Sequence, residues 1–211
     1  MESFPILSPL VTVRDVLIFE TEHGEVMVIG CDSAGGIGPK TLDKIKVDGY
    51  TLGKFTARVA LMEVLSTGAK PVCLVNTLSV EPEPTGNDII RGVKDEAKKA
   101  GLDPKLAVTG SSEKNIRVEQ TGIGVTVIGI TSKELLKIGC SKPKDIIVAV
   151  GLPCVGNEVV SAEKKGKIAD ISDLCKLLGM DFIHQIIPVG SKGIAYEIGI
   201  IAKESSLEFK L

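Results

Sequence analysis

Hydrophobic and polar residues alternate along two stretches near the start of the chain, residues 11–19 and 25–29. A period of two is typical of half-buried β-strands. The polar segment Thr21-Glu22-His23-Gly24 separates the two stretches. The pattern therefore predicts a β-hairpin. Residues 42–50 are a candidate for a further strand.

Helical spacing replaces this alternation in two later segments. The first covers residues 53–67 and stops before Gly68, and the second follows the capping residues Asn87 and Asp88 and ends near Gly101. Apolar residues recur every three or four positions in both, which is typical of amphipathic helices. Those positions are Phe55, Val59, Met62 and Leu65 in the first helix, and Ile89, Ile90, Val93 and Ala97 in the second.

The rest of the chain mixes the two patterns. Short apolar runs predict strands at 70–80, 106–108, 123–130, 146–150, 182–189 and 194–200, with a loop at 82–86 and a short helix at 168–178. This alternation of element types predicts an α+β fold. We expect one main domain, residues 1–150, followed by a reduced C-terminal subdomain, residues 151–211.

Composition narrows the class of protein. Twenty-five Lys and Arg against 27 Asp and Glu give a net charge of −2 without a long block of one sign, so nucleic acid is not an expected partner. No run of about 18 apolar residues predicts a membrane helix, and the first residues lack the pattern of a secretory signal. The five cysteines form no CxxC pair. A reducing compartment, the cytoplasm, is the expected location.

The segment after residues 26–29 carries the strongest chemical signal. Asp32 opens the sequence Asp32-Ser33-Ala34-Gly35-Gly36-Ile37-Gly38-Pro39-Lys40. A carboxylate, flexible backbone and a cation are the parts of a magnesium–phosphate site. A Walker A motif ending at Lys40 would need glycine where Ala34 and Pro39 stand. Any phosphate site here therefore belongs to another architecture.

Five segments indicate which architecture this is, because their order along the chain matches that of a known set of motifs. They are residues 13–18, Cys31-Asp32-Ser33, Leu52-Gly53-Lys54 with residues 57–71, the stretch 108–112, and residues 139–151. Together they resemble the motifs of the ATP-binding superfamily that includes aminoimidazole ribonucleotide synthetase, thiamine-monophosphate kinase, selenophosphate synthetase and a hydrogenase-maturation dehydratase. The resemblance implies a mixed or antiparallel sheet with helices on one face, and a homodimer that pairs two such sheets.

The same resemblance implies ATP and Mg²⁺ as cofactors and assigns roles to residues. Asp15, Asp32 and Glu63 are expected to hold metal, and Asp32 to orient or deprotonate the nucleophile. Phosphate contacts are expected from Gly35, Gly36, Gly38, Lys40, Lys54 and Ser111. Ser111 stands where the family has an acid, and Glu113 is the candidate substitute.

Each of these residues also has a structural interpretation. Asp15 and Asp32 are typical turn or cap residues, Glu63 is typical of a solvated helix face, and the charged residues 163–167 are typical of a solvated cluster. His184, among apolar neighbours, favours a hydrogen-bonded strand histidine.

In its length and altered acidic motifs the chain resembles a shortened branch of the superfamily that includes α-ribazole kinase, which phosphorylates the 5′-hydroxyl of α-ribazole in cobamide salvage. The resemblance therefore implies a magnesium-dependent ATP:small-molecule kinase. Three alternatives remain open. They are an enzyme like thiamine-monophosphate kinase, a non-catalytic ATP-binding regulatory module, and a dimerisation domain alone.

Overall fold

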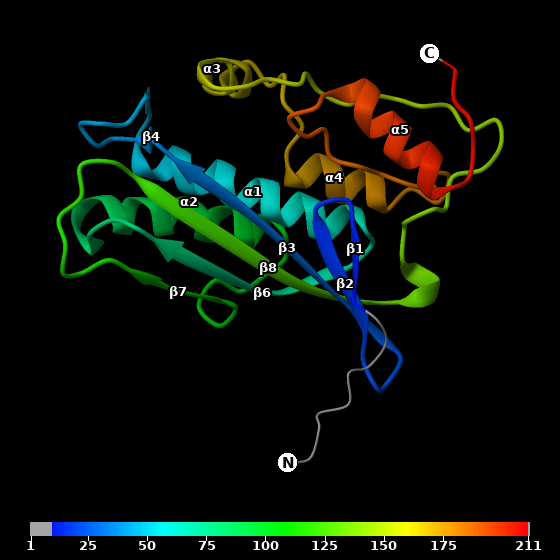
Figure 1. Cartoon of the computed structure of the whole chain (residues 1–211), viewed down its shortest axis with the longest axis horizontal. Coiled ribbons are helices and arrows are strands. Elements are labelled where there is room, and N and C mark those ends of the chain that lie inside the picture. The colour runs from blue at the N-terminus through cyan, green and yellow to red at the C-terminus, as the bar shows by residue number, and fades with distance from the viewer. Residues whose placement is uncertain (1–9, 211) are drawn as a thin grey trace.

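A computed structural model describes residues 10–210 of the chain (Figure 1). Its main feature is a six-stranded mixed sheet of order β1-β2-β3-β8-β6-β7, in which only β6 and β7 are parallel. The strands are β1 (Val11–Val13), β2 (Val16–Glu20), β3 (Glu25–Gly35), β6 (Lys70–Leu78), β7 (Val108–Ser112) and β8 (Gly122–Ser132). A separate parallel pair joins β4 (Ile37–Gly38) to β5 (Ile45–Lys46).

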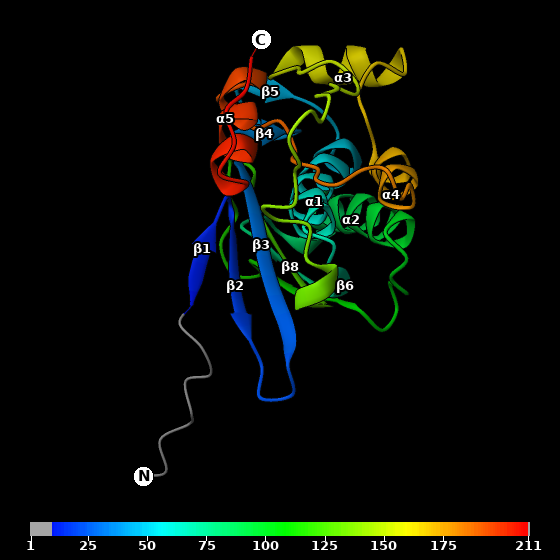
Figure 2. The same ribbon diagram turned by 90° about the vertical axis from the view of Figure 1, so that its right-hand side faces the viewer.

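The two longest helices lie on one side of the sheet (Figure 2). α1 (Gly49–Ser66) packs against β3, β8 and β6, and α2 (Asn87–Lys99) packs against α1. Further along the chain come α3 (Asn157–Lys164), α4 (Ile171–Leu178) and α5 (Ile194–Glu204), and two short helical turns are η1 (Pro82–Gly86) and η2 (Lys133–Leu135). The expected α+β sheet with helices on one face is confirmed.

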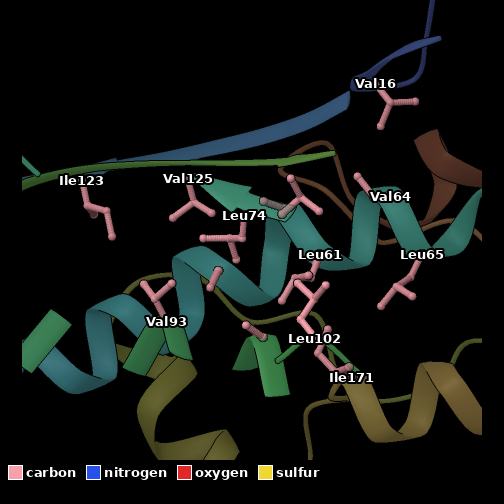
Figure 3. Packing of buried hydrophobic residues seen from close by; sticks show 14 of the residues in the cluster. Val16, Leu61, Val64, Leu65, Leu74, Val93, Leu102, Ile123, Val125 and Ile171 are labelled. Carbon is pink, nitrogen blue, oxygen red and sulfur yellow. The ribbon is translucent and has the colours of Figure 1, made fainter. Parts of the chain in front are cut away.

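The core lies between the sheet and α1, and Figure 3 shows its packing. Alternate residues of the long strands point inward, so Val28 of β3 and Val125 and Val127 of β8 are almost fully buried. They meet Leu61 and Val64 of α1. The two-residue period of the strands and the helical period of α1 thus supply the two halves of one core.

Two glycines set the distance between α1 and α2. A Cβ atom on Gly53 would lie 2.1 Å from the carbonyl oxygen of Ile89, and one on Gly92 would lie 2.1 Å from that of Tyr50. No side chain fits at such a separation. The backbones of the two helices therefore approach more closely than helices with larger residues at the contact.

The first predicted strand, 11–19, is in fact a hairpin. Arg14 adopts φ 54° and, with Asp15, turns the chain between β1 and β2. Its guanidinium donates to the Glu204 carboxylate at 2.8–3.2 Å and to the carbonyl oxygen of Ile186 at 2.8 Å. These partners lie more than 170 residues away in the sequence, so a local pattern does not reveal the turn.

The prediction that Asp32 follows the end of a strand was also wrong. β3 continues to Gly35, because residues 32–35 pair with residues 122–125 of β8. Residues 42–50 contribute only the short β5, and Asp48 then caps α1 by accepting the N–H of Thr51. The strand predicted at 106–108 lies instead at Val108–Ser112.

The C-terminal predictions differ most from the structure. Residues 146–150 and 182–189 form no strand, and residues 194–200 belong to α5. Ile146 and Val148 are strongly exposed, since no neighbouring strand covers them. Ile198 and Ala202, four positions apart, are the buried residues of α5, a spacing that suits a helix as well as a strand. The predicted helix at 168–178 is confirmed as α4.

Among residues 10–210, the main helix-to-sheet contacts are those of α1 on the face of Val28, and the second face has no comparable helix contact. Leu17, Ile29 and Ile128 stand opposite one another across β2, β3 and β8, on the face away from Val28. All three are only half-buried.

Among residues 10–210, none of the helices is both long and apolar enough to cross a membrane.

Candidate functional site

Asp32 lies in the middle of β3 and on its inner face. It pairs with Val125 of β8. It lies an even number of residues from Val28 and Gly30, so it is on the same face of β3 as they are, the face toward α1. Burial raises the pKa of the Asp32 carboxyl, and a hydrogen bond from the backbone of Ser33 opposes that rise. A carboxylate in this position is poorly solvated and favours a cation as neighbour.

Glu63 reaches the same region from α1. A Cβ atom on Gly30 would lie 3.4 Å from the Glu63 Cβ, so α1 crosses β3 beside Asp32. Glu63 is 8% exposed, and within residues 10–210 its carboxylate makes no hydrogen bond or ion pair. Burial, followed by the negative charge of Asp15, raises its pKa to about 7. The interpretation of Glu63 as a solvated helix residue is therefore wrong.

Asp15 completes the group from the turn between β1 and β2. Its charge acts on Glu63, as do the charges of Asp32 and of Glu197 on α5. The neighbouring Arg14 lowers the Glu63 pKa but is already held by Glu204. Asp15 and Asp32 are thus near enough to Glu63 to raise its pKa, and we call these three residues, the predicted metal ligands, the carboxylate cluster.

The chemistry of the cluster fits magnesium bound together with phosphate. In the described part of the chain, no three acidic, His or Cys side chains converge closely enough to enclose a metal ion by themselves. Magnesium commonly uses one or two carboxylates and takes its other ligands from phosphate and water. The unpartnered carboxylate of Glu63, beside two further hard oxygen donors, suits that mode of binding.

The segment from Gly35 to Lys40, which we call the glycine loop, is held by Asp43, a residue that the sequence did not indicate. Gly36 and Gly38 have φ +71° and +147°, which favour glycine. Buried Asp43 accepts the N–H of Lys40 at 2.8 Å, and the N–H and hydroxyl of Thr121 at 2.8 and 2.6 Å. The Gly36 N–H donates to the Thr121 carbonyl at 2.9 Å. These N–H groups therefore bind protein rather than standing free for phosphate.

Lys40 points into a pocket at the N-terminal end of α1. The pocket has a volume of about 660 Å³ and is formed by four segments around Lys40, Gly49, Pro84 and Ile116. The Lys40 ammonium pairs with Glu81 at 2.5 Å. We call this the N-terminal pocket. It is separate from the carboxylate cluster, because Glu63 lies fourteen residues further along α1, about 21 Å at the rise of an α-helix.

Lys54 belongs to a third group of charges. It pairs with Glu163 of α3, which also pairs with Arg58 of α1 at 2.9 Å. Arg58 in turn binds Glu96 of α2 at 3.1 Å. Hydrogen bonds from Arg58 and Lys54 lower the Glu163 pKa to about 2. The interpretation of 163–167 as only a solvated cluster is wrong for Glu163, and Lys54 serves to dock α3.

Ser111, Glu113 and His184 lie outside both sites. Ser111 is exposed on the edge strand β7, paired with Thr77. Glu113 accepts backbone N–H groups at 2.7 and 3.1 Å and so fixes its own loop. The Nδ1 of His184 lies 2.8 Å from the Asp145 carboxylate. The expected hydrogen bond is present, although His184 is not in a strand.

The order of these residues and the sheet topology agree with a known family. The sequence profile of the AIR synthase related protein N-terminal domain matches residues 14–131, more than half of the chain. The chain belongs to the AIR synthase-related family. The matched region contains Asp15, Asp32, Glu63 and the glycine loop. Among curated proteins, no sequence matches the chain.

Solved structures with this fold include several AIR synthase-related proteins. The thiamine-monophosphate kinase of Stenotrophomonas maltophilia K279a is 14% identical, with a TM-score of 0.56. The match covers 92% of this chain and 65% of the kinase chain. AaThiL complexed with AMPPCP and TMP is 13% identical, with a TM-score of 0.56, covering 91% and 64%. T. maritima PurL complexed with ADP is 15% identical, with a TM-score of 0.54, covering 93% and 30%.

These identities show a shared fold. The chain spans less than two thirds of the length of each of these three proteins. Two of the three, AaThiL and T. maritima PurL, are crystallised with AMPPCP and with ADP. The activity of this chain must be argued from its own residues.

Proposed function

We propose that the protein is a magnesium-dependent kinase that transfers a phosphoryl group from ATP to a small molecule. The observation that carries the proposal is the buried, unpartnered Glu63 carboxylate beside Asp15 and Asp32. The ionised form of Glu63 is poorly solvated here, so a bound cation would stabilise it. The binding of AMPPCP by AaThiL and of ADP by PurL supports ATP as the nucleotide.

The proposed chemistry needs little covalent help from the protein. Magnesium, when bound, neutralises charge on the phosphate oxygens. Asp15, Asp32 and Glu63 would hold the cation from a turn, a strand and a helix. Asp32 would also orient the acceptor hydroxyl and accept its proton as the new bond to phosphorus forms and the bond from phosphorus to the ADP oxygen breaks. The raised pKa of Asp32 makes its carboxylate a better proton acceptor than an ordinary aspartate.

The proposed acceptor is a nucleoside-like molecule, α-ribazole, whose ribose 5′-hydroxyl would receive the phosphoryl group. Resemblance to a short branch of the family supports this choice. Thiamine monophosphate is the alternative acceptor, supported by the fold shared with thiamine-monophosphate kinase. A non-catalytic ATP-binding module is a further candidate, favoured by the exposed edge position of Ser111, where the family has an acid.

The test is ADP release from ATP and Mg²⁺ with α-ribazole, with thiamine monophosphate, and without an acceptor, followed by mass spectrometry. Added phosphate on α-ribazole is the expected product. A product from thiamine monophosphate alone would correct the acceptor. Tight ATP binding with no transfer to either acceptor would contradict the kinase and favour the regulatory module.

Asp32→Asn is expected to reduce turnover by about 100-fold or more, because the amide neither holds the cation as a carboxylate does nor accepts the proton. Its thermal stability should be unchanged or higher, since a poorly solvated charge is removed. Turnover and the thermal transition should be measured on the same preparation. Near-normal turnover would remove Asp32 from the mechanism.

We also propose that two copies pair through the second face of the sheet. The row formed by Leu17, Ile29 and Ile128 is apolar and, within residues 10–210, has no main helix contact, and such a face is typical of an interface. α3, the first helix of the proposed C-terminal subdomain 151–211, docks on α1 on the other side of the sheet.

Ile29→Asp is expected to convert a dimer to a monomer in light scattering at micromolar concentration, because it places a charge in the apolar row. The matched control is Leu106→Asp. Leu106 is 87% exposed and lies in the loop before β7, so its substitution should leave the mass unchanged. A wild-type monomer, or a dimer that survives Ile29→Asp, would contradict this interface.

A further inference from the structure

Arg14 is a buried cation beside the carboxylate cluster. It precedes Asp15 in the turn between β1 and β2, and only 3% of its side chain is exposed. Two residues later, Val16 pairs with Gly30, and a Cβ atom on Gly30 would lie 3.4 Å from the Glu63 Cβ. The turn therefore lies close to the part of α1 that carries Glu63. Burial and the charge of Asp15 raise the Glu63 pKa, and the positive charge of Arg14 opposes that rise.

The hydrogen bonds of Arg14 nevertheless go to another part of the chain. Its guanidinium donates to the Glu204 carboxylate through Nε and Nη2 at 2.8–3.2 Å, and through Nη1 to the carbonyl oxygen of Ile186 at 2.8 Å. Within residues 10–210, it donates to neither Asp15 nor Glu63. Both acceptors belong to the C-terminal region, residues 151–211. Figure 2 shows α5, in red, beside the turn that carries Arg14.

Glu204 is itself held in place by polar neighbours. Its carboxylate is 11% exposed and accepts a hydrogen bond from the amide of Gln185 at 2.6 Å. The amide oxygen of Gln185 in turn accepts the N–H of Cys140 and the hydroxyls of Ser141 and Ser205, each at 3.0 Å. The Arg14–Glu204 pair is therefore fixed and poorly solvated. Loss of one member of such a pair leaves the other as a buried charge without compensation.

Two carboxylates of the cluster stand beside Arg14. Asp15 is its neighbour in the chain, and Glu63 is the member without a partner among residues 10–210. An ion pair between Arg14 and Glu63 would satisfy both charges, but it would occupy the carboxylate oxygens that a cation needs. We infer that Glu204 is a positioning residue for the carboxylate cluster, which holds Arg14 away from Glu63 and so keeps Glu63 free for the cation. The inference rests on the proposed function, because it concerns the same metal site.

The experiment is calorimetry of AMPPCP binding to the full chain over a series of Mg²⁺ concentrations. Glu204→Gln should need about tenfold or more Mg²⁺ than wild type for half-maximal binding, because Arg14 then competes for Glu63. The double variant Arg14→Met/Glu204→Gln should return close to the wild-type requirement. Both variants lack the Arg14–Glu204 pair, so a loss of α5 docking alone would weaken both equally.

Glu163→Gln is the matched control for Glu204→Gln. Glu163 also joins the C-terminal region to a buried arginine, Arg58, at 2.9 Å, but it lies on α3, and Arg58 keeps Glu96 as a partner. The Mg²⁺ requirement of this variant should equal that of wild type. An unchanged requirement in Glu204→Gln, or equal weakening in the single and the double variant, would overturn the inference.

A second measurement follows the guanidinium without metal or nucleotide. The Arg14 Nε–H signal in a nitrogen–proton NMR spectrum, identified by its loss in Arg14→Met, should change little when Glu63→Gln is added to wild type. In the Glu204→Gln background, Glu63→Gln should shift the signal clearly, because it removes the new partner. Equal shifts in both backgrounds would contradict the role of Glu204. AMPPCP binding by wild type that ignores Mg²⁺ would instead contradict the proposed function, and the NMR comparison would still decide whether Glu204 holds Arg14 away from Glu63.

Discussion

Glu63→Gln is expected to stabilise the fold at pH 8 while weakening magnesium-dependent nucleotide binding by about tenfold or more. The Glu63 pKa is about 7 in the folded protein against an ordinary value of 4.5. Each unit of such a difference corresponds to about 1.4 kcal/mol, so ionised Glu63 lowers the free energy of unfolding by up to about 3 kcal/mol. Glutamine keeps the shape of the side chain and removes the charge.

The pH dependence has a definite sign. Between pH 4.5 and about 7 the folded state binds more protons at Glu63 than the unfolded state does, so the free energy of unfolding falls as pH rises through this window. Urea unfolding of wild type at pH 5 and pH 8, without divalent cations, should show this loss. The glutamine variant should lose less over the same interval. Equal pH profiles for the two proteins would contradict a poorly solvated carboxylate with a raised pKa at position 63.

Arg58→Ala is expected to lower the free energy of unfolding by about 3–5 kcal/mol. Glu96 is fully buried, and Arg58 is its partner at 3.1 Å with only 3% of its side chain exposed. Removal of one member of a buried pair leaves a charge without compensation. Urea unfolding at neutral pH measures the change.

Lys99→Ala is the matched control for this prediction. Lys99 also contacts Glu96, at 3.0 Å, but its side chain is 35% exposed. Its loss should lower the free energy of unfolding by about 1 kcal/mol or less. Similar losses in both variants would contradict the assignment of Arg58 as the main partner of Glu96. Because Arg58 also binds Glu163, the Arg58 variant should additionally expose α3 to proteolysis.

Local sequence patterns predicted the elements that have one apolar and one polar face. The alternation of β8 and the helical spacing of α1 gave the bounds of both elements to within about four residues, but the predicted face of α1 was wrong, since Val59 is 43% exposed while Leu61 and Val64 pack in the core. Long-range pairing decided the rest. β3 extends through Asp32 because β8 lies beside it, and the apolar run at 146–150 forms no strand because no partner strand is available.

The candidate site shows the same difference between what local motifs and what long-range contacts determine. Motif order predicted a metal site at Asp15, Asp32 and Glu63, which stays a prediction; the structure shows that α1 crosses β3 at Gly30 and that the charges of Asp15 and Asp32 act on Glu63. Lys54 and Lys40 have acidic partners, Glu163 and Glu81, that no local pattern links to them. Buried Asp43 was missed because its partner, Thr121, is 78 residues away.

The most direct test of the carboxylate cluster is the binding of AMPPCP, a non-hydrolysable ATP analogue, measured by calorimetry with and without Mg²⁺. Wild type should bind it saturably only with Mg²⁺, and both Asp32→Asn and Glu63→Gln should weaken that binding by about tenfold or more while remaining folded. Binding that is independent of Mg²⁺, or equal in wild type and both variants, would contradict a magnesium–nucleotide site at Asp15, Asp32 and Glu63.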